Sequence, residues 1–265
     1  MSCPSCKEPF YARDIRQTYC SARCRSQAFL ESTRPPSWDP GPLPKPMPWG
    51  YKEVPLAVVT HPKRIAWANS LAEAVNAEAV IVDKHSWGCE TTHLRALEWL
   101  GSGTCPWSVV LEDDAVPIPF FRRQLHAMLR VAPTPIVSLY LGRSRPPHWQ
   151  SSISQTLAAV REKDACFLRC RDLLHAVGYA VHTSLIPEML VSIGRTTPID
   201  EGISAWAREQ GHEISMSWPS LVDHRDKGSL ITHQDGQDRT EPRKAWYADS
   251  REVWEPTQAE IPVPA

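Results

Sequence analysis

The stretch Ser108-Val-Val-Leu-Glu-Asp-Asp-Ala-Val116 runs from a β-branched apolar segment directly into three consecutive carboxylates, Glu112, Asp113 and Asp114. An apolar run of this kind predicts a strand that is covered on both faces. Since ligands bind at the carboxyl ends of strands in open α/β sheets, the acidic end is a candidate site. Oxygen ligands favour Mg²⁺ or Mn²⁺, which keep positions open for phosphate oxygens. The alternative is an acidic turn whose aspartates cap a helix over 117–130.

The orientation of these three side chains limits how many of them can reach one ion. In a continuing strand, successive side chains point to opposite faces, so Glu112 and Asp114 would share one face and Asp113 would lie on the other. We therefore expect one or two of the three carboxylates, and not all three, to contact a given metal.

Strands and helices alternate after residue 55, and this alternation predicts a mostly parallel, three-layer α/β/α domain. No Gly-x-Gly-x-x-Gly follows the first strand and no P-loop is present, which disfavours a dinucleotide fold or an NTPase. The expected strands are 56–60, 79–83, 107–111, 136–141, 176–182 and 213–217. The expected helices are 63–76, 91–100, 120–130, 151–161, 185–193 and 201–210.

Four cysteines near the N-terminus form two closely spaced pairs, Cys3 with Cys6 and Cys20 with Cys24. Two such pairs about a dozen residues apart predict a tetrahedral four-thiolate Zn²⁺ site, in a zinc-ribbon-like module over residues 1–33. So short a segment buries little apolar surface, and the metal would therefore supply its folding free energy. Its role stays open between docking of nucleic acid or a partner and a structural cap.

Composition and segment boundaries narrow the class of protein further. A net charge of −1 with 22% charged residues gives no general attraction to nucleic acid, a membrane or a polyanion. No apolar segment approaches the ~18 residues of a membrane-spanning helix and no signal peptide is evident, so we expect a cytoplasmic protein. We expect a proline-rich linker over 34–54, a larger domain over 55–236, and a partly disordered C-terminal extension over 237–265.

Four segments of the larger domain occur in a recognisable order. They are His61-Pro-Lys-Arg64, Leu111-Glu-Asp-Asp114, Gly178-Tyr-Ala180 leading to Pro198-Ile-Asp200, and Pro219-Ser-Leu-Val-Asp-His224. Together they resemble glycosyltransferase family 25, the lipooligosaccharide and collagen galactosyltransferase group, and more closely the related transferases encoded by bacteriophages. The resemblance covers roughly residues 55–235. It implies the GT-A type fold of nucleotide-diphospho-sugar transferases, and a host-cytoplasmic location if the chain is phage-encoded.

The resemblance also implies a reaction: a sugar passes from a nucleotide-diphosphate donor, expected to be a UDP-sugar, to a hydroxyl on a protein or glycan acceptor. Asp114 and His224 would hold Mn²⁺ or Mg²⁺, which stabilises the charge that develops on the diphosphate. Asp200 would be the base that deprotonates the acceptor, or alternatively the N-cap of the helix from 201. The residues expected to bind the nucleotide-sugar are Thr60, Arg64, Asp83, Glu112, Asp113, Tyr140 and Gly142.

Two other classes of protein remain open. The first is a metal-dependent nuclease or phosphohydrolase that uses the same carboxylates, with the zinc module holding nucleic acid; the lack of a basic stripe counts against it. The second is a zinc-ribbon binding protein whose larger domain is a non-catalytic relative of a transferase. The intact set of acidic residues and His224 counts against that class.

Overall fold

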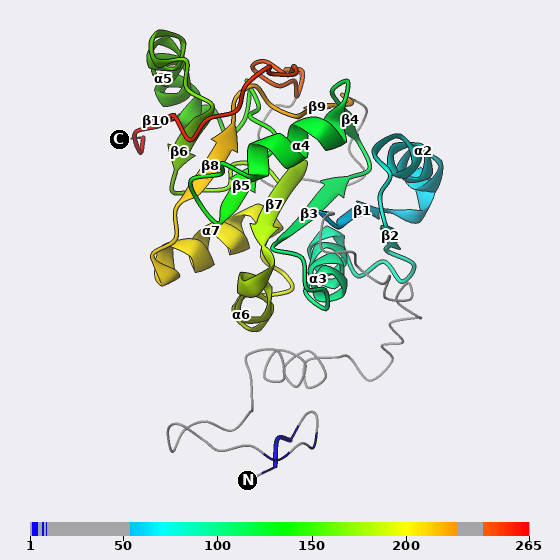
Figure 1. Ribbon diagram of the computed structural model, residues 1–265. Helices are drawn as coiled ribbons and strands as arrows, with labels where there is room; N and C mark the ends of the chain where they lie inside the picture. The colour runs from blue at the N-terminus through cyan, green and yellow to red at the C-terminus, as the bar shows by residue number, and fades with distance from the viewer. Residues whose placement is uncertain (1, 5–6, 8, 10–53, 227–240, 265) are drawn as a thin grey trace.

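The structure is a computed structural model that describes residues 2–4, 7, 9, 54–226 and 241–264 (Figure 1). Of the four cysteines predicted to bind zinc, only Cys3 belongs to this part of the chain. The prediction of a zinc module over 1–33, and that of a linker over 34–54 apart from Val54, therefore lie outside the described residues and stay predictions.

An eight-stranded sheet forms the centre of the described domain, in the order β10-β6-β8-β5-β7-β3-β1-β2 (Figure 1). Its central strands are largely buried, as the apolar runs in the sequence predict; all five residues of β1 are buried, whereas two of the three residues of the edge strand β10 are exposed. The strands are β1 (Leu56–Thr60), β2 (Ala79–Val82), β3 (Trp107–Glu112), β5 (Ile136–Ser138), β6 (Phe167–Cys170), β7 (Gly178–His182), β8 (Ile214–Ser217) and β10 (Gln258–Glu260).

The sheet is mixed, whereas we expected a mostly parallel one. Strand β7 runs antiparallel to both of its neighbours, β3 and β5, and β6 runs antiparallel to β8. The other pairs described, including β1 with β2 and with β3, are parallel. The expectation was wrong in this respect because a strand buried on both faces has the same apolar composition whichever way it runs.

Helices cover both faces of the sheet, which confirms an α/β fold. Helices α3, α6 and α7 pack on one face, and α2 and α4 pack on the other. Helix α5 lies at the far end of the sheet from α2, beside β6 and β10 (Figure 1). The helices are α2 (Ile65–Val75), α3 (Cys89–Leu100), α4 (Phe121–Leu129), α5 (Gln150–Lys163), α6 (Ile186–Ser192) and α7 (Ile199–Gln210), with short 3₁₀ turns at Pro62–Arg64, Pro147–Trp149 and Thr183–Leu185.

A second, two-stranded sheet lies beside the main one and consists of β4 (Ala115–Pro117) and β9 (Val222–His224). The two strands are antiparallel, and Ala115 is paired with His224. This pairing brings the residues just after β3 next to a segment more than a hundred residues later in the chain. The sequence analysis did not anticipate it.

The C-terminal segment contributes to the fold, although we expected a partly disordered extension there. Strand β10 pairs in parallel with β6, and Trp254 and Ile261 are buried. The side chain of Gln124 on α4 accepts a hydrogen bond from Trp254 Nε1 at 2.7 Å and exchanges two with the backbone of Arg251. Among the described residues, no helix is long and apolar enough to span a membrane.

Candidate functional site

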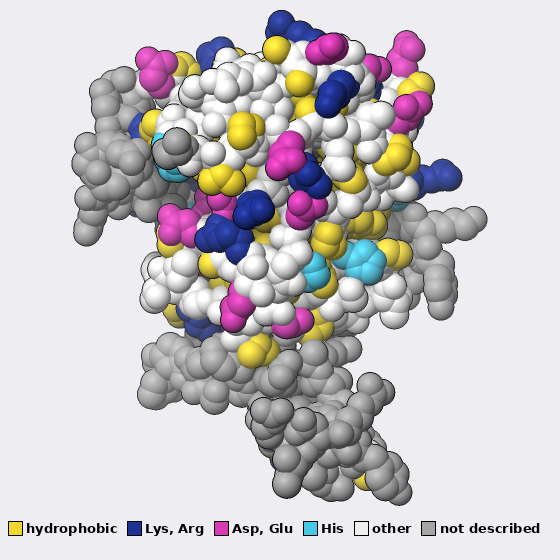
Figure 2. Space-filling model, turned by 90° about the vertical axis from the view of Figure 1, so that its left-hand side faces the viewer, with side chains coloured by type: hydrophobic (Ala, Val, Ile, Leu, Met, Phe, Trp, Pro, Cys, Tyr) yellow, Lys and Arg dark blue, Asp and Glu magenta, His cyan; other side chains and the backbone are white. Residues whose placement is uncertain are grey.

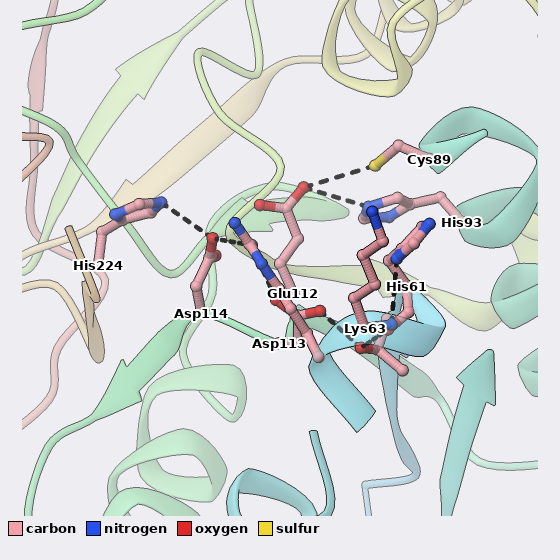
Figure 3. A network of polar contacts seen from close by, with 10 residues as sticks. His61, Lys63, Cys89, His93, Glu112, Asp113, Asp114 and His224 are labelled. Carbon is pink, nitrogen blue, oxygen red and sulfur yellow. Dashed lines mark hydrogen bonds and ion pairs between the residues drawn. The ribbon is translucent and has the colours of Figure 1, made fainter. Parts of the chain in front are cut away.

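The candidate site begins where β3 ends. Glu112 is the last residue of the strand, and Asp113 and Asp114 form a turn that leads into β4. Because the strand does not continue, the alternation that we expected for the three carboxylates is wrong. Glu112 lies on the α3 face, like Val110 two residues before it, whereas Asp113 and Asp114 both contact Arg64, which follows β1 in the chain (Figure 3).

Two residues near the end of β1, Thr60 in the strand and Arg64 in the 3₁₀ turn after it, hold the paired aspartates. Thr60 Oγ1 donates a hydrogen bond to Asp113 Oδ2 at 2.6 Å. Arg64 Nη1 bridges the two carboxylates, at 3.2 Å from Asp113 Oδ1 and 2.9 Å from Asp114 Oδ2. The side chains of this cluster are largely buried, so one guanidinium compensates two negative charges with little help from solvent.

His224 reaches the same cluster from β9. Its Nε2 lies 3.5 Å from Asp114 Oδ2, which is longer than an ordinary hydrogen bond. Asp114 Oδ1 and His224 Nδ1 are both buried, and neither has a hydrogen-bond partner among the residues that the structure describes. The two atoms that face each other are Asp114 Oδ2 and His224 Nε2, and not the two unpartnered ones. Their 3.5 Å separation matches two ligand atoms bound at about 2.1 Å to one divalent ion, which lie about 3 to 3.5 Å apart.

The two aspartates differ in their electrostatics. Burial raises the pKa of Asp113 above its ordinary value, although the hydrogen bond from Thr60 and the charge of Arg64 act against it. For Asp114, burial also acts to raise the pKa, but His224 and Arg64 together hold it below its ordinary value. Asp114 is therefore the carboxylate of the pair that stays ionised most readily, as a metal ligand must.

The alternative of a helix-capping role for the aspartates does not match the structure. The N-cap of α4 is Phe120, and no side chain caps this helix end. Asp113 and Asp114 instead face the side chains of Thr60, Arg64 and His224.

Glu112 belongs to a different set of contacts, on the α3 side of the strand. Its Oε1 lies 3.3 Å from His93 Nε2 and 3.9 Å from Cys89 Sγ (Figure 3). His93 is fully buried, and its Nδ1 is 3.1 Å from the hydroxyl of Tyr179 on β7. The candidate ligand atoms of Cys89, His93 and Glu112 all lie within 4.8 Å of one another, so these three residues could hold a metal ion.

Asp200 lies in the first turn of α7 and is half-buried. Its N-cap alternative is not what the structure shows, because Pro198 occupies the N-cap and Asp200 Oδ1 accepts a hydrogen bond from the neighbouring Glu201 N at 3.0 Å. Burial, and then the negative charge of Glu112, raise the pKa of Asp200 to about 6. A carboxylate with a pKa this close to neutrality is suited to exchange a proton with a substrate.

Three other expected nucleotide-binding residues make internal contacts. Both oxygens of Asp83 accept backbone hydrogen bonds, from Trp87 N at 2.8 Å and Gly88 N at 3.1 Å, and so fix the loop before α3. Tyr140 is buried, with its ring 6.2 Å from that of His224. Gly142 lies against Tyr140 and His175, where an added Cβ would come within 2.7 Å of His175 Nε2.

The sequence analysis missed Cys89 and His93. The signal is present in the chain, since a Cys-x-x-x-His spacing puts both side chains on one face of a helix. We expected the helix to begin at residue 91, whereas α3 begins at Cys89. That difference of two residues excluded the cysteine from the helix face on which the histidine lies.

Comparisons with protein-family models and with curated proteins gave no match for this chain. The resemblance to glycosyltransferase family 25 therefore rests on the four sequence segments alone. In the structure, two of those segments, His61–Arg64 and Leu111–Asp114, meet through Arg64, and the segment that ends in His224 joins them.

Proposed function

We propose that the chain is a metal-dependent glycosyltransferase with a GT-A type domain, which transfers a sugar from a nucleotide-diphosphate donor, expected to be a UDP-sugar, to a hydroxyl of a protein or glycan. The observation that carries the proposal is the meeting of Asp114 and His224 at the carboxyl end of β3, where Asp114 Oδ2 and His224 Nε2 lie 3.5 Å apart in a buried cluster. Ligands bind at such a strand end in open α/β folds.

In this proposal, Asp114 and His224 hold Mn²⁺ or Mg²⁺, with Asp113 in support. The ion, when bound, stabilises the negative charge of the departing nucleoside diphosphate. Arg64 neutralises the two aspartates and supplies a further cation at the site. Thr60 keeps Asp113 in place through its 2.6 Å hydrogen bond.

Asp200 is the residue proposed to take the proton. The acceptor hydroxyl forms the new bond to the anomeric carbon as the bond from that carbon to the phosphate oxygen breaks, and the hydroxyl proton passes to the Asp200 carboxylate. Its pKa of about 6 means that the group is ionised at neutral pH and can still accept a proton. Supporting this role, Asp200 is close enough to Glu112 for the two charges to interact.

The first experiment is the thermal midpoint of the full-length protein with UDP, GDP and CDP, each with and without Mn²⁺. A ligand at about 100 times its dissociation constant adds about 2.7 kcal/mol of stability, which gives a clear shift. We expect a shift that requires both one nucleotide and the metal. No shift with any pair would contradict the proposal.

Asp114→Asn tests the metal ligand directly. We expect nucleotide affinity in the presence of Mn²⁺ to fall at least about 30-fold, the equivalent of about 2 kcal/mol for losing one partner of a buried charged contact. The matched control is Asp249→Asn. It makes the same chemical change at a surface carboxylate, which accepts a hydrogen bond from the Tyr247 hydroxyl. Unchanged affinity in Asp114→Asn, measured by calorimetry, would show that this carboxylate does not hold the metal.

One observation favours a second candidate, a metal-dependent phosphohydrolase. The group of Cys89, His93 and Glu112 can hold a metal near the same strand end, and paired metal ions serve phosphate-ester hydrolysis. On the face seen in Figure 2, acidic and basic side chains are interspersed, which offers nucleic acid no continuous basic stripe there.

Hydrolysis of a simple phosphodiester without any nucleotide-dependent thermal shift would favour the phosphohydrolase. Nucleotide binding without turnover of any donor would instead favour a non-catalytic binding protein.

A further inference from the structure

The contacts of Glu112 with α3 have the form of a separate metal-binding group. Cys89 and His93 are four residues apart on α3, so their side chains lie one above the other on the helix face that meets β3. Glu112, at the end of β3, is directed between them (Figure 3). A helix pair at this spacing together with one carboxylate from a neighbouring element is a common way for proteins to present three metal ligands.

His93 is oriented as a ligand would be. It is fully buried, and the Tyr179 hydroxyl lies 3.1 Å from its Nδ1, which leaves Nε2 directed at Glu112 Oε1. Metal-binding histidines typically use their second ring nitrogen in this way, and the partner fixes the ring and its tautomer. The Tyr179 ring also stacks on the imidazole, with centroids 5.8 Å apart.

The charges around the group would favour a cation. Burial, followed by the negative charges of Glu112, Glu90 and Asp200, raises the pKa of the Cys89 thiol far above its ordinary value. A bound divalent ion reverses this balance, because it deprotonates a coordinating thiol and offsets the carboxylates that face it.

We propose that Cys89, His93 and Glu112 bind one Zn²⁺ ion, at a site distinct from the Asp114–His224 pair. A thiolate, an imidazole and a carboxylate form a ligand set that suits zinc better than Mg²⁺ or Mn²⁺, which prefer oxygen ligands alone. Three protein ligands leave the fourth tetrahedral position to water, as in zinc sites that are not purely structural. The ion would tie the start of α3 to the end of β3.

The test is the zinc content of the full-length protein and its variants after removal of loosely bound metal. The N-terminal cysteines are predicted to bind zinc as well, so the difference between proteins is the quantity that matters. We expect Cys89→Ser to contain one equivalent of zinc less than the unmodified chain. The matched control is Cys170→Ser, since Cys170 is a buried free cysteine on β6, several strands away in the sheet. It should retain the full zinc content.

Tyr179→Phe provides a second variant that keeps all three ligands. Loss of the hydroxyl that holds His93 should weaken zinc binding at this site about 10- to 100-fold, measured by competition with a chelating dye. Substitution with Co²⁺ should give a sulfur-to-cobalt absorption band that Cys89→Ser reduces and Cys170→Ser does not. Equal zinc content in all the proteins, with an unchanged cobalt spectrum in Cys89→Ser, would overturn the proposal. These measurements need no nucleotide, so their outcome is independent of the proposed transferase activity.

Discussion

The end of β3 presents two unlike environments within three residues. On the β1 side, Asp113 and Asp114 meet an arginine and the β9 histidine, and the ligand atoms are mostly oxygens. On the α3 side, Glu112 meets a thiol and a fully buried imidazole. The first environment suits a hard cation that binds phosphate, and the second suits zinc. A run of consecutive acids can therefore serve two chemistries when the strand ends inside it.

Asp200 interacts with Glu112 and so belongs to the α3 side of the site. Its substitution should have the largest effect on the rate of the proposed reaction. We expect Asp200→Asn to lower turnover about 10²- to 10⁴-fold, the usual contribution of a general base, while nucleotide affinity stays unchanged. Steady-state rates and calorimetry on the same preparation separate the two. A loss of nucleotide affinity instead of turnover would assign Asp200 to the donor site.

The pH dependence gives the same residue a second test. The charged groups that act on Asp200 are Glu112 on β3 and Glu201 on its own helix, and Asp200 in turn acts on Cys89. Because its pKa is raised to about 6, the base is protonated below that pH, and the rate should rise as pH increases through about 6. The free energy of unfolding changes in the opposite direction to the rate. Because the folded state holds this proton more tightly than the unfolded chain, the stability that the proton contributes is lost as pH rises from about 4 to about 6. Asp200→Asn should remove this slope from a thermal-melt series.

Arg64→Ala tests the β1 side. It leaves two buried carboxylates facing each other, and breaking a buried ion pair costs about 3 to 5 kcal/mol. We expect the free energy of unfolding to fall by about 3 kcal/mol without metal, and Mn²⁺ to restore a larger part of it than in the unmodified protein. The control is Arg169→Ala, which removes a partly exposed arginine paired with two exposed glutamates and should cost no more than about 1 kcal/mol. Equal losses in both variants, by urea denaturation, would mean that Arg64 does not compensate the aspartates.

Asp83→Asn should have the smallest effect, and it distinguishes loop support from nucleotide recognition. Its carboxylate accepts two backbone hydrogen bonds, of which an amide oxygen can keep one. A loss of about 1 kcal/mol in stability with nucleotide affinity unchanged is expected. A nucleotide affinity that falls more than about tenfold, which approaches the contribution of one hydrogen bond to a charged group, would show that Asp83 contacts the nucleotide.

The six helices and six of the strands could be predicted because apolar patterns mark them. Strand β6 (Phe167–Cys170) was not expected, since its four residues include Arg169 and no β-branched residue. The helix ending at Val75 and the strand ending at Thr60 lie where the apolar pattern puts them. Strand direction could not be predicted, since burial on both faces gives the same composition to β7 as to its neighbours. Strand β10 was missed because its three residues, an exposed glutamine, an alanine and an exposed glutamate, form no apolar pattern. Only its pairing with β6 makes this segment a strand.

The site was predictable to the extent that strand ends determine it. The positions of Thr60, Arg64, Asp113 and Asp114 follow from parallel strands that end at one edge of the sheet. Glu112 faces α3 while Asp113 and Asp114 face Arg64 because the strand ends in a turn after Glu112. The alternation of side chains along a strand gives no sign of that turn. The contact between Asp114 and His224 depends on the pairing of β4 with β9, which is a tertiary feature with no local signal.

The pairing of β4 with β9 also has a consequence for biosynthesis. Asp114 and His224 are separated by about 110 residues, and a ribosome that adds about 5 to 20 residues per second takes about 5 to 20 s to synthesise them. Throughout that interval the nascent chain contains the carboxylates and Arg64 but not the histidine. In the proposed site, a metal ion would therefore meet its complete ligand set only after the end of the domain has left the ribosome, and loading of the ion would follow translation of the domain.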